Sequence, residues 1–448
     1  MKKPLLFLLM CLSAVFLGAQ TSFHAEDMNL SGGDAPIVRS WDNGGAAVTY
    51  YEVGLKKYVQ YTNYLTGDSY RSEIPSYMQI YDMYILGDTV YYCGYSVLDS
   101  AGPGVIGYFD PREMYVSSNL NFHTLPVRPL SHVYKLVAQR NASGGGVEVI
   151  GIGEHQWTDT IHEGGNIINI PHLVRHFVFC HDILQNPVDY DTIEIPLNEH
   201  YFNVLLTTNY VVFVGLADYF SYDMICLRIR KRIESSPYLT LNHPHAFPTG
   251  ANEIFSAMHS TAMEGDNIAT SYMHIDVATG DVSNRVRVID VGQMLMLNSQ
   301  EYLVPDKSEV GDIVYIPYDK SLVCMHDFLT PLNYFNTNFV YLDPTAIGNY
   351  PANIEYLNST FFKSMIKKGS RYYLASLGPN WFLKDKAVVG TYPDPSCPEN
   401  EEIDIHVLDN LTEIPANIPL DRTTIRESKR QDGLPIERRP TSIICNNP

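Results

Sequence analysis

The stretch Met78-Gln-Ile-Tyr-Asp-Met-Tyr-Ile-Leu86, Gly87-Asp88, Thr89-Val-Tyr-Tyr-Cys-Gly94 decides the fold class of this chain. Two runs rich in β-branched and aromatic residues flank a Gly-Asp pair. Glycine and aspartate accept the positive φ angles that two-residue hairpin turns require, and the flanking residue types favour strands. The stretch therefore predicts two antiparallel strands joined by a tight turn.

The same pattern recurs along the chain. In a second copy, Phe202–Thr207 precedes Thr208-Asn209, and Tyr210-Val-Val-Phe-Val-Gly215 follows. Placing Asp88 on Asn209 aligns Val90 with Val211, Tyr92 with Phe213, and Gly94 with Gly215. Looser copies turn at 43–45, 144–146, 265–266, 319–320 and 368–369. Several units add a third predicted strand, at Val105–Asp110, Met224–Ile229, Arg285–Asp290 and Asn338–Asp343.

The spacing of these units indicates how they assemble. The strands after the seven turns begin near residues 46, 89, 147, 210, 267, 321 and 371, so successive units lie 43 to 63 residues apart. One small antiparallel sheet cannot bury both of its faces, and its edges invite pairing with other chains. Packing such sheets around an axis solves both problems, as in a β-propeller. We predict an all-β propeller over residues 36–395 with seven blades, six or eight remaining open; tandem β-sandwich domains are the alternative.

A resemblance supports this prediction. The run Gly87–Gly94, followed by Gly107-Tyr-Phe-Asp110, resembles the blade repeats of secreted bacterial β-propeller proteins of unassigned function. The chain lacks the Trp-Asp ending of WD40 blades and the double glycine of kelch blades. The resemblance implies a fold and no activity, because propellers host both enzymes and binding scaffolds.

The two ends of the chain differ from the repeats. Lys2 and Lys3, an apolar run from Leu5 to Leu17, and Gly18-Ala19-Gln20 together predict a signal peptide over residues 1–19. Residues 20–35 form a polar lead-in. In residues 396–448, the alternation from Ile403 to Val407 predicts an edge strand that closes the ring by completing the first blade, followed by a solvated tail.

Composition restricts the function classes. Apolar residues make up 45% of the 448 residues and charged residues 18%, which excludes a disordered protein. The formal net charge of −19 argues against nucleic acid or an anionic membrane surface as the main partner. After the signal peptide, no stretch is apolar enough to span a bilayer. We expect a soluble protein in the periplasm, on the cell surface or outside the cell.

Six cysteines follow the signal peptide. Four lie inside apolar segments and are expected to be small buried hydrophobic residues: Cys93, Cys180, Cys226 and Cys324. Cys397 and Cys445 lie in turn-rich surroundings near the end of the chain. In an oxidising compartment this pair is the candidate disulfide.

A search for catalytic, cofactor and metal motifs gives no candidate residue. There is no phosphate-binding loop and no Gly-x-Ser-x-Gly elbow. His172 and His176 have the spacing of a helical zinc pair, but the following Phe177-Val-Phe-Cys180 indicates a strand, on which the two imidazoles are far apart. We therefore predict no metal site and no cofactor.

These observations favour a non-enzymatic propeller that binds or scaffolds a protein or a glycan. The alternative is a hydrolase or lyase acting on polysaccharide, with acids and histidines converging at the central funnel. Ionisable groups with strongly shifted pKa values that meet in the funnel would favour the enzyme.

Overall fold

The structure is a computed structural model, and it describes residues 37–407 with gaps. The gaps are residues 42–45, 54–55, 64–68, 98–103, 116–119, 142–144, 164–165, 186–187, 220–221, 233–244, 249–252, 277–278, 280–281, 303–308, 317–319, 330–334, 346–347, 351–352, 358–360, 369–370, 378–386 and 394–403. The predicted signal peptide, the lead-in, the tail and both cysteines of the candidate disulfide lie outside the described residues. Among the described residues, no helix has the length and apolar character needed to cross a membrane.

The first half of the described chain forms four antiparallel sheets, each from consecutive strands. The first sheet contains β1 (Ile37–Trp41), β2 (Ala46–Val53), β3 (Lys56–Asn63) and β4 (Ser69–Ile74). The second contains β5 (Met78–Leu86), β6 (Thr89–Ser96), β7 (Gly104–Phe109) and β8 (His123–Pro126), with the short 3-10 helix η1 (Pro111–Tyr115) before β8. The third contains β9 (His132–Arg140), β10 (Val147–Glu163), β11 (Asn166–Cys180) and β12 (Tyr190–Glu194). The fourth contains β13 (Glu199–Leu206), β14 (Tyr210–Tyr219), β15 (Tyr222–Lys231) and β16 (His245–Pro248).

Three further sheets complete the described strands. The fifth contains β17 (Glu253–Ala262), β18 (Asn267–Asp276), β19 (Val282–Asp290), β20 (Leu295–Tyr302) and β24 (Gly348–Tyr350). The sixth contains β21 (Glu309–Ile316), β22 (Ser321–Leu329), β23 (Phe335–Leu342) and β25 (Asn353–Leu357). The seventh contains β26 (Phe361–Lys368), β27 (Arg371–Leu377), β28 (Ala387–Pro393) and β29 (Asp404–Val407).

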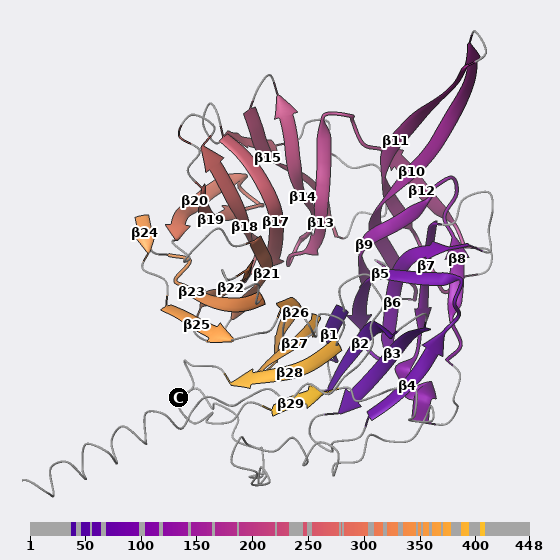
Figure 1. Ribbon diagram of the computed structural model, residues 1–448, viewed down its shortest axis with the longest axis horizontal. Coiled ribbons are helices and arrows are strands. Elements are labelled where there is room, and N and C mark those ends of the chain that lie inside the picture. The colour runs from indigo at the N-terminus through magenta and orange to yellow at the C-terminus, as the bar shows by residue number, and fades with distance from the viewer. Residues whose placement is uncertain are drawn as a thin grey trace, which may run out of the picture.

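The sheets follow one another around a common centre (Figure 1). The first strand of each sheet is innermost and lies against the first strand of the next, from β1 through β5, β9, β13, β17 and β21 to β26. The ring closes because β26 also lies against β1. This is a β-propeller, and the tandem-sandwich alternative is wrong. The described strands fall into seven sheets, and the blade count of the complete chain stays a prediction.

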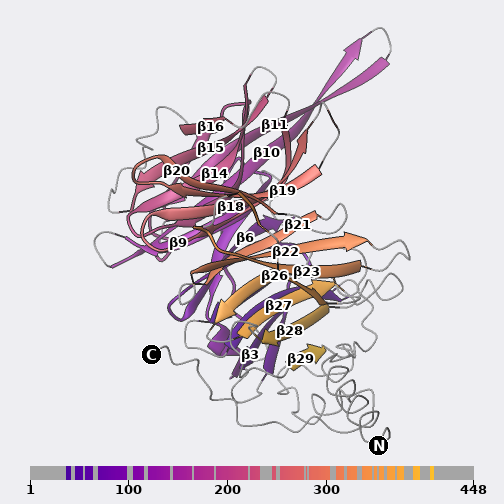
Figure 2. The ribbon, with the colours of Figure 1, turned by 90° about the vertical axis from the view of Figure 1, so that its left-hand side faces the viewer.

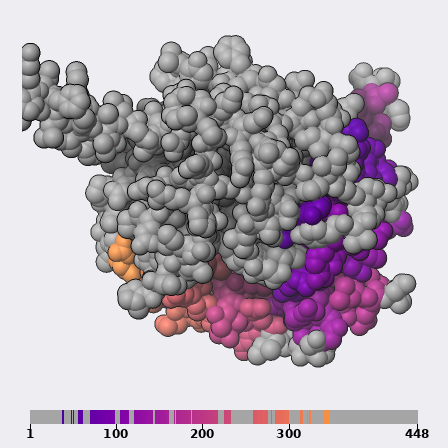
Figure 3. All heavy atoms as spheres, turned by 90° about the horizontal axis from the view of Figure 1, so that it is seen from below, coloured from indigo at the N-terminus to yellow at the C-terminus, as the bar shows by residue number. Residues whose placement is uncertain are grey.

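The hydrophobic core consists of layers between neighbouring sheets. Residues aligned between the two clearest repeats, Val90 with Val211 and Tyr92 with Phe213, are all fully buried. Tyr92 packs in the layer between the first and second sheets, whereas Phe213 packs between the third and fourth. The coloured atoms of successive sheets adjoin one another on the surface (Figure 3). From the first to the sixth sheet, stacking of neighbouring sheets thus buries the apolar faces between them, as the repeat pattern predicts.

Two strands differ from simple sequential order. The expected strand near Ile405 is present as β29, but it pairs with β28 in the seventh sheet and does not complete the first. The physical reason is that the first sheet already has four strands from residues 37–74, whereas β26–β28 give the seventh sheet only three. The edge of β28 is therefore open to pair with β29. The short β24, from the segment between β23 and β25, crosses over to pair parallel with β20.

Candidate functional site

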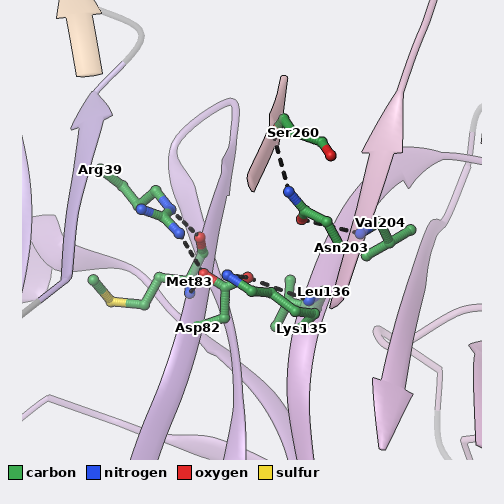
Figure 4. Close-up of polar contacts among 8 residues, drawn as sticks. All are labelled: Arg39, Asp82, Met83, Lys135, Leu136, Asn203, Val204 and Ser260. Atoms are coloured by element: carbon green, nitrogen blue, oxygen red, sulfur yellow. Dashed lines mark hydrogen bonds and ion pairs between the residues drawn. The ribbon is translucent and has the colours of Figure 1, made fainter. Parts of the chain in front are cut away.

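Polar groups from five innermost strands make contacts between neighbouring sheets, Ser260 through its backbone carbonyl. We call Arg39, Asp82, Lys135, Asn203 and Ser260, from five successive innermost strands, the axial belt (Figure 4). The Arg39 side chain donates to the carboxylate of Asp82, and its Nε donates to the Met83 carbonyl at 2.7 Å. Lys135 Nζ lies 3.9 Å from Asp82 Oδ2. Charged groups from three neighbouring sheets therefore meet between the innermost strands.

Bulges in β5 and β13 aim the side chains of Asp82 and Asn203. In β5 the pairing with β6 shifts between Ile80 and Asp82, opposite Gly94. In β13 it shifts between Tyr201 and Asn203, opposite Gly215. A Cβ at Gly94 would lie 1.7 Å from the Gln79 carbonyl oxygen, so only glycine permits this close approach. The aligned glycines of the repeat thus create the bulges that turn Asp82 and Asn203 toward the next sheet.

The belt uses its hydrogen-bonding groups to join sheets. Asp82 Oδ1 accepts from the Met83 amide at 2.9 Å, and Asp82 Oδ2 accepts from the Leu136 amide of the third sheet at 3.4 Å. Asn203 Oδ1 accepts from the Val204 amide at 3.0 Å, and its Nδ2 donates to the Ser260 carbonyl of the fifth sheet at 3.0 Å. With both of its oxygens engaged, the carboxylate of Asp82 joins the first, second and third sheets.

A second set of charged groups lies between the third and fourth sheets. On β15, Arg228 and Arg230 point to the same side because they are two residues apart. Arg228 Nη2 lies 2.7 Å from Glu199 Oε1, and Arg230 Nη2 lies 2.5 Å from Glu148 Oε2. Gln139 Nε2 also donates to Glu148 at 2.8 Å. Arg230 is fully buried, so this seam contains paired charges that solvent does not reach.

Ionisable groups from β9, β10, β11 and β13 gather nearby. His132 Nε2 lies 2.7 Å from Glu154 Oε1, and Arg175 Nε lies 3.9 Å from Glu154 Oε2. The hydrogen bond from His132 lowers the pKa of Glu154, which stays ionised. Burial, reinforced by the Arg175 guanidinium, lowers the pKa of His200 to about 4. We call His132, Glu154, Arg175 and His200 the base cluster. It combines the ionised carboxylate of Glu154 with the neutral imidazole of His200, and it lies where β10 and β11 leave the ring.

Beyond the base cluster, β10 and β11 continue as a two-stranded ribbon. Pairing between β9 and β10 ends at Glu154, and pairing between β11 and β12 begins at His176. Residues 155–163 of β10 and 166–175 of β11 pair only with each other among the described residues. We call this ribbon the arm; it projects well beyond the ring in both views (Figures 1 and 2).

The arm exposes apolar and aromatic side chains on both faces. On one face, the Trp157 ring stacks on His172 with centroids 4.9 Å apart and on His155 at 4.7 Å. His172 Nε2 lies 2.9 Å from Asp159 Oδ2. Other apolar side chains are exposed on the two faces: Ile170 by 37%, Leu173 by 38% and Ile167 by 65%. None of the arm side chains that the structure describes belongs to a buried hydrophobic cluster.

The structure places the cysteines and histidines that the sequence analysis considered. Cys93, Cys180, Cys226 and Cys324 are buried and unbridged, as expected. His172 and His176 lie on strand β11, as expected, and His176 is on the stretch that pairs with β12. Among the described residues, no three His, Cys, Asp or Glu side chains gather in a way that would hold a metal ion.

The arm itself was missed by the sequence reasoning. Its signal was the longest spacing in the repeat, the 63 residues between the strands near 147 and 210. That unit holds β10, with 17 residues, and β11, with 15, where β6 has only 8. The alternation of residue types continues through the arm. This alternation predicts that the segment is a strand, but it does not predict whether one or two other strands pair with it.

Comparison with known proteins extends to the fold alone. No family model matches the chain, and no curated protein has significant sequence similarity to it. Among solved structures, it is similar to the β-propeller domain of the Trilobed protease from Pyrococcus furiosus, described as having an open velcro topology. That match has a TM-score of 0.49 and 10% identity, and it covers 88% of this chain and 100% of the other.

Two enzyme structures also match. An acylaminoacyl peptidase from Pyrococcus horikoshii gives a TM-score of 0.46 at 12% identity, covering 88% of this chain and 53% of that one. Trypanosoma rangeli sialidase, in complex with the inhibitor DANA, gives 0.37 at 9%, covering 68% and 53%. The chain thus spans about half the length of both enzymes. Identities this low carry no information about activity.

Proposed function

We propose that this chain is an exported, non-catalytic β-propeller that binds a partner protein through the arm. The single observation that carries the proposal is the arm's projection from the ring with exposed apolar side chains on both faces. An isolated two-stranded ribbon is marginally stable in water, and exposed apolar patches on soluble proteins mark interaction sites. The base cluster supports this role because Glu154, His132 and Arg175 tie the root of the arm to the ring.

A protein fits the arm better than a glycan does. Sugar rings stack on open aromatic faces, but the Trp157 ring already stacks on two imidazoles. The other large apolar side chains that the arm exposes, Ile167, Ile170 and Leu173, are aliphatic and offer no aromatic face to a sugar ring. Aliphatic and aromatic side chains on a rigid ribbon are the groups that form the centre of protein interfaces.

Truncation of the arm tests the proposal. In the truncated variant, an Asn-Gly turn replaces residues 156–173 and joins His155 to Val174, a pair of the hairpin whose backbone groups face each other. The probes are a phage-displayed library of random nonapeptides and a glycan array, applied to the full protein and to the truncated variant. We expect peptides that bind the full protein and bind the truncated variant at least tenfold more weakly. Peptide binding that survives truncation, or binding to glycans alone, overturns the proposal.

The catalytic alternative places a polysaccharide hydrolase or lyase at the funnel. The candidate acid with a shifted pKa is Glu154, which lies on β10 beside the innermost strand β9 and whose carboxylate His132 holds. The check is release of reducing sugar or unsaturated product from a panel of polysaccharides by the full protein and by Glu154→Gln. We expect no turnover by either protein. Turnover that is lost in Glu154→Gln would replace the binding proposal with the enzyme.

Export is a separate part of the proposal. The charge and apolar pattern of residues 1–19 supports it, with cleavage after Ala19. Fractionation of the source cells, followed by N-terminal sequencing, tests it. We expect protein outside the cytoplasm that begins at Gln20. Cytoplasmic protein that retains Met1 contradicts export without affecting the role of the arm.

A further inference from the structure

We propose that the outward edge of β10 in the arm is an acceptor site for an extended segment of another protein, which adds to the ribbon as a third strand. This inference rests on the proposed function and specifies how the partner is held. The contact is made through backbone hydrogen bonds to the edge of β10. The exposed side chains on the two faces of the arm then contact the side chains of the added segment, and these contacts determine which segments bind.

The direction of the β10 backbone follows from its last contacts with the loop before β9. The Glu154 carbonyl accepts from the Ser131 amide at 2.8 Å. The Gln156 amide donates to Ser131 Oγ at 2.8 Å, and Ser131 Oγ donates to the Gln156 carbonyl at 3.1 Å. The backbone groups of Glu154 and Gln156 therefore point away from β11. Because backbone direction alternates along a strand, those of Thr158, Thr160 and His162 point the same way.

Ser131 also ends the ladder on this side. Its hydroxyl satisfies both backbone groups of Gln156, so no further residue of the β9 side is needed there. Beyond this point, β10 has no partner on its outward edge among the described residues. Thr158, Thr160 and His162 thus present three amides and three carbonyls in a row, which is a ready template for another strand.

The opposite edge of the arm is blocked. Arg175 points outward from β11, since its carbonyl accepts from the Ile195 amide at 2.8 Å. By the same alternation Leu173, Pro171 and Asn169 also point outward. Pro171 lies directly across from Thr158 and has no amide hydrogen to donate. Proline is a common device against edge pairing, and β10 has no proline, lysine or arginine between residues 155 and 163.

The chemistry of the arm defines the occupant. Along β10, Trp157 and Asp159 face one side and Thr158 and Thr160 the other. An added strand would place β-branched residues beside the threonines and an aromatic or aliphatic residue beside Trp157. The net charge of −19 favours an uncharged or basic segment and disfavours a second copy of the same acidic chain. The occupant is thus an extended, non-acidic peptide segment of a different protein.

A pair of proline variants tests the inference. Thr160 and Asn169 lie directly opposite each other, and both backbones point outward, so Thr160→Pro and Asn169→Pro spare the bonds between β10 and β11. Both substitutions also remove the hydrogen bond between Thr160 Oγ1 and Asn169 Oδ1, which are 3.1 Å apart. Thr160→Pro removes an outward amide hydrogen from the edge of β10, whereas Asn169→Pro removes one from the edge of β11. The probe is the tightest nonapeptide from the phage library, fluorescently labelled and measured by anisotropy.

We expect Thr160→Pro to weaken peptide binding at least tenfold and Asn169→Pro to change it less than twofold. In hydrogen exchange, the peptide should protect the amides of Thr158, Thr160 and His162 in the wild type. The inference is overturned if both variants weaken binding equally, or if Thr160→Pro binds like the wild type. It is also overturned if the wild type sediments as a dimer that Thr160→Pro dissociates, since the edge then pairs with a second copy. Binding lost on truncation but kept in Thr160→Pro would reject the edge and leave the proposed function standing.

Discussion

The hairpin of β10 and β11 contains two regions of opposite character. Near the ring, Val149 packs toward the second sheet and Ile150 toward the fourth, so both faces of the hairpin are buried. In the arm, Trp157 and Ile167 are exposed. The strands are continuous, and the backbone pairing is the same throughout. Neighbouring sheets, and not the hairpin itself, therefore decide which part of a strand becomes core.

The largest expected effect on stability comes from a substitution at the bulge between β5 and β6, in the buried part of the ring. Replacing Gly94 by alanine would place a Cβ 1.7 Å from the Gln79 carbonyl oxygen, a backbone atom that has nowhere to move. We expect a loss of about 4 kcal/mol or more in the free energy of unfolding. The matched control is Gly145→Ala, where nothing lies within 4 Å, measured by the same denaturant titration. Equal stability of the two variants would show that the bulge is not needed.

The buried ion pair between the third and fourth sheets gives the next largest effect. Glu148→Gln leaves the fully buried Arg230 without its counter-charge, at an expected cost of about 3–5 kcal/mol. The exposed pair of Lys56 and Glu73, 3.0 Å apart, is the control, and Glu73→Gln should cost far less than Glu148→Gln because water screens the exposed charges. A similar cost in both variants, in urea unfolding, would mean that the seam is open to solvent.

A smaller effect depends on pH. The pKa of His200 is lowered to about 4 by burial and by Arg175, so the unfolded chain binds the proton more readily than the folded one. Its contribution to stability is therefore present above the ordinary histidine pKa of about 6.5 and is lost as the pH falls toward 4. We expect the difference in unfolding free energy between the wild type and His200→Gln to vary across this window. A constant difference from pH 7 to pH 4 would contradict the assigned environment.

The smallest effect is expected in the arm. Replacing residues 156–173 by an Asn-Gly turn removes side chains that no neighbouring sheet buries, so the melting temperature should stay within about 2 °C of the wild type. Thermal unfolding followed by circular dichroism measures it. A large fall in melting temperature would show that the arm belongs to the core, and would remove the contrast with the buried part of the hairpin.

The sequence predicts much of the fold because turn chemistry is local. The pairs at Gly87 and Thr208 join antiparallel strands where expected, and the aligned glycines Gly94 and Gly215 occupy equivalent bulges. The destination of β29 was not predictable, because pairing depends on which sheet lacks a strand. The direction of Asp82 and Asn203 toward neighbouring sheets depends on the bulges, which a regular alternation does not reveal. The signal peptide and the pairing of Cys397 with Cys445 stay predictions.

The placement of β29 has a consequence for how the chain can be cut and rejoined. Because β26–β29 and β1–β4 form separate sheets, the described strands from the two ends of the chain share no hydrogen-bonded sheet. A circular permutant that begins between β8 and β9 would still build each sheet from the same strands. A new opening between β20 and β21 is a poorer choice, since β24 pairs with β20 from beyond that point. The chain could thus begin between most pairs of successive sheets and still form the same sheets. The exception is the connection after β20, because β24 pairs with β20 from a later part of the chain.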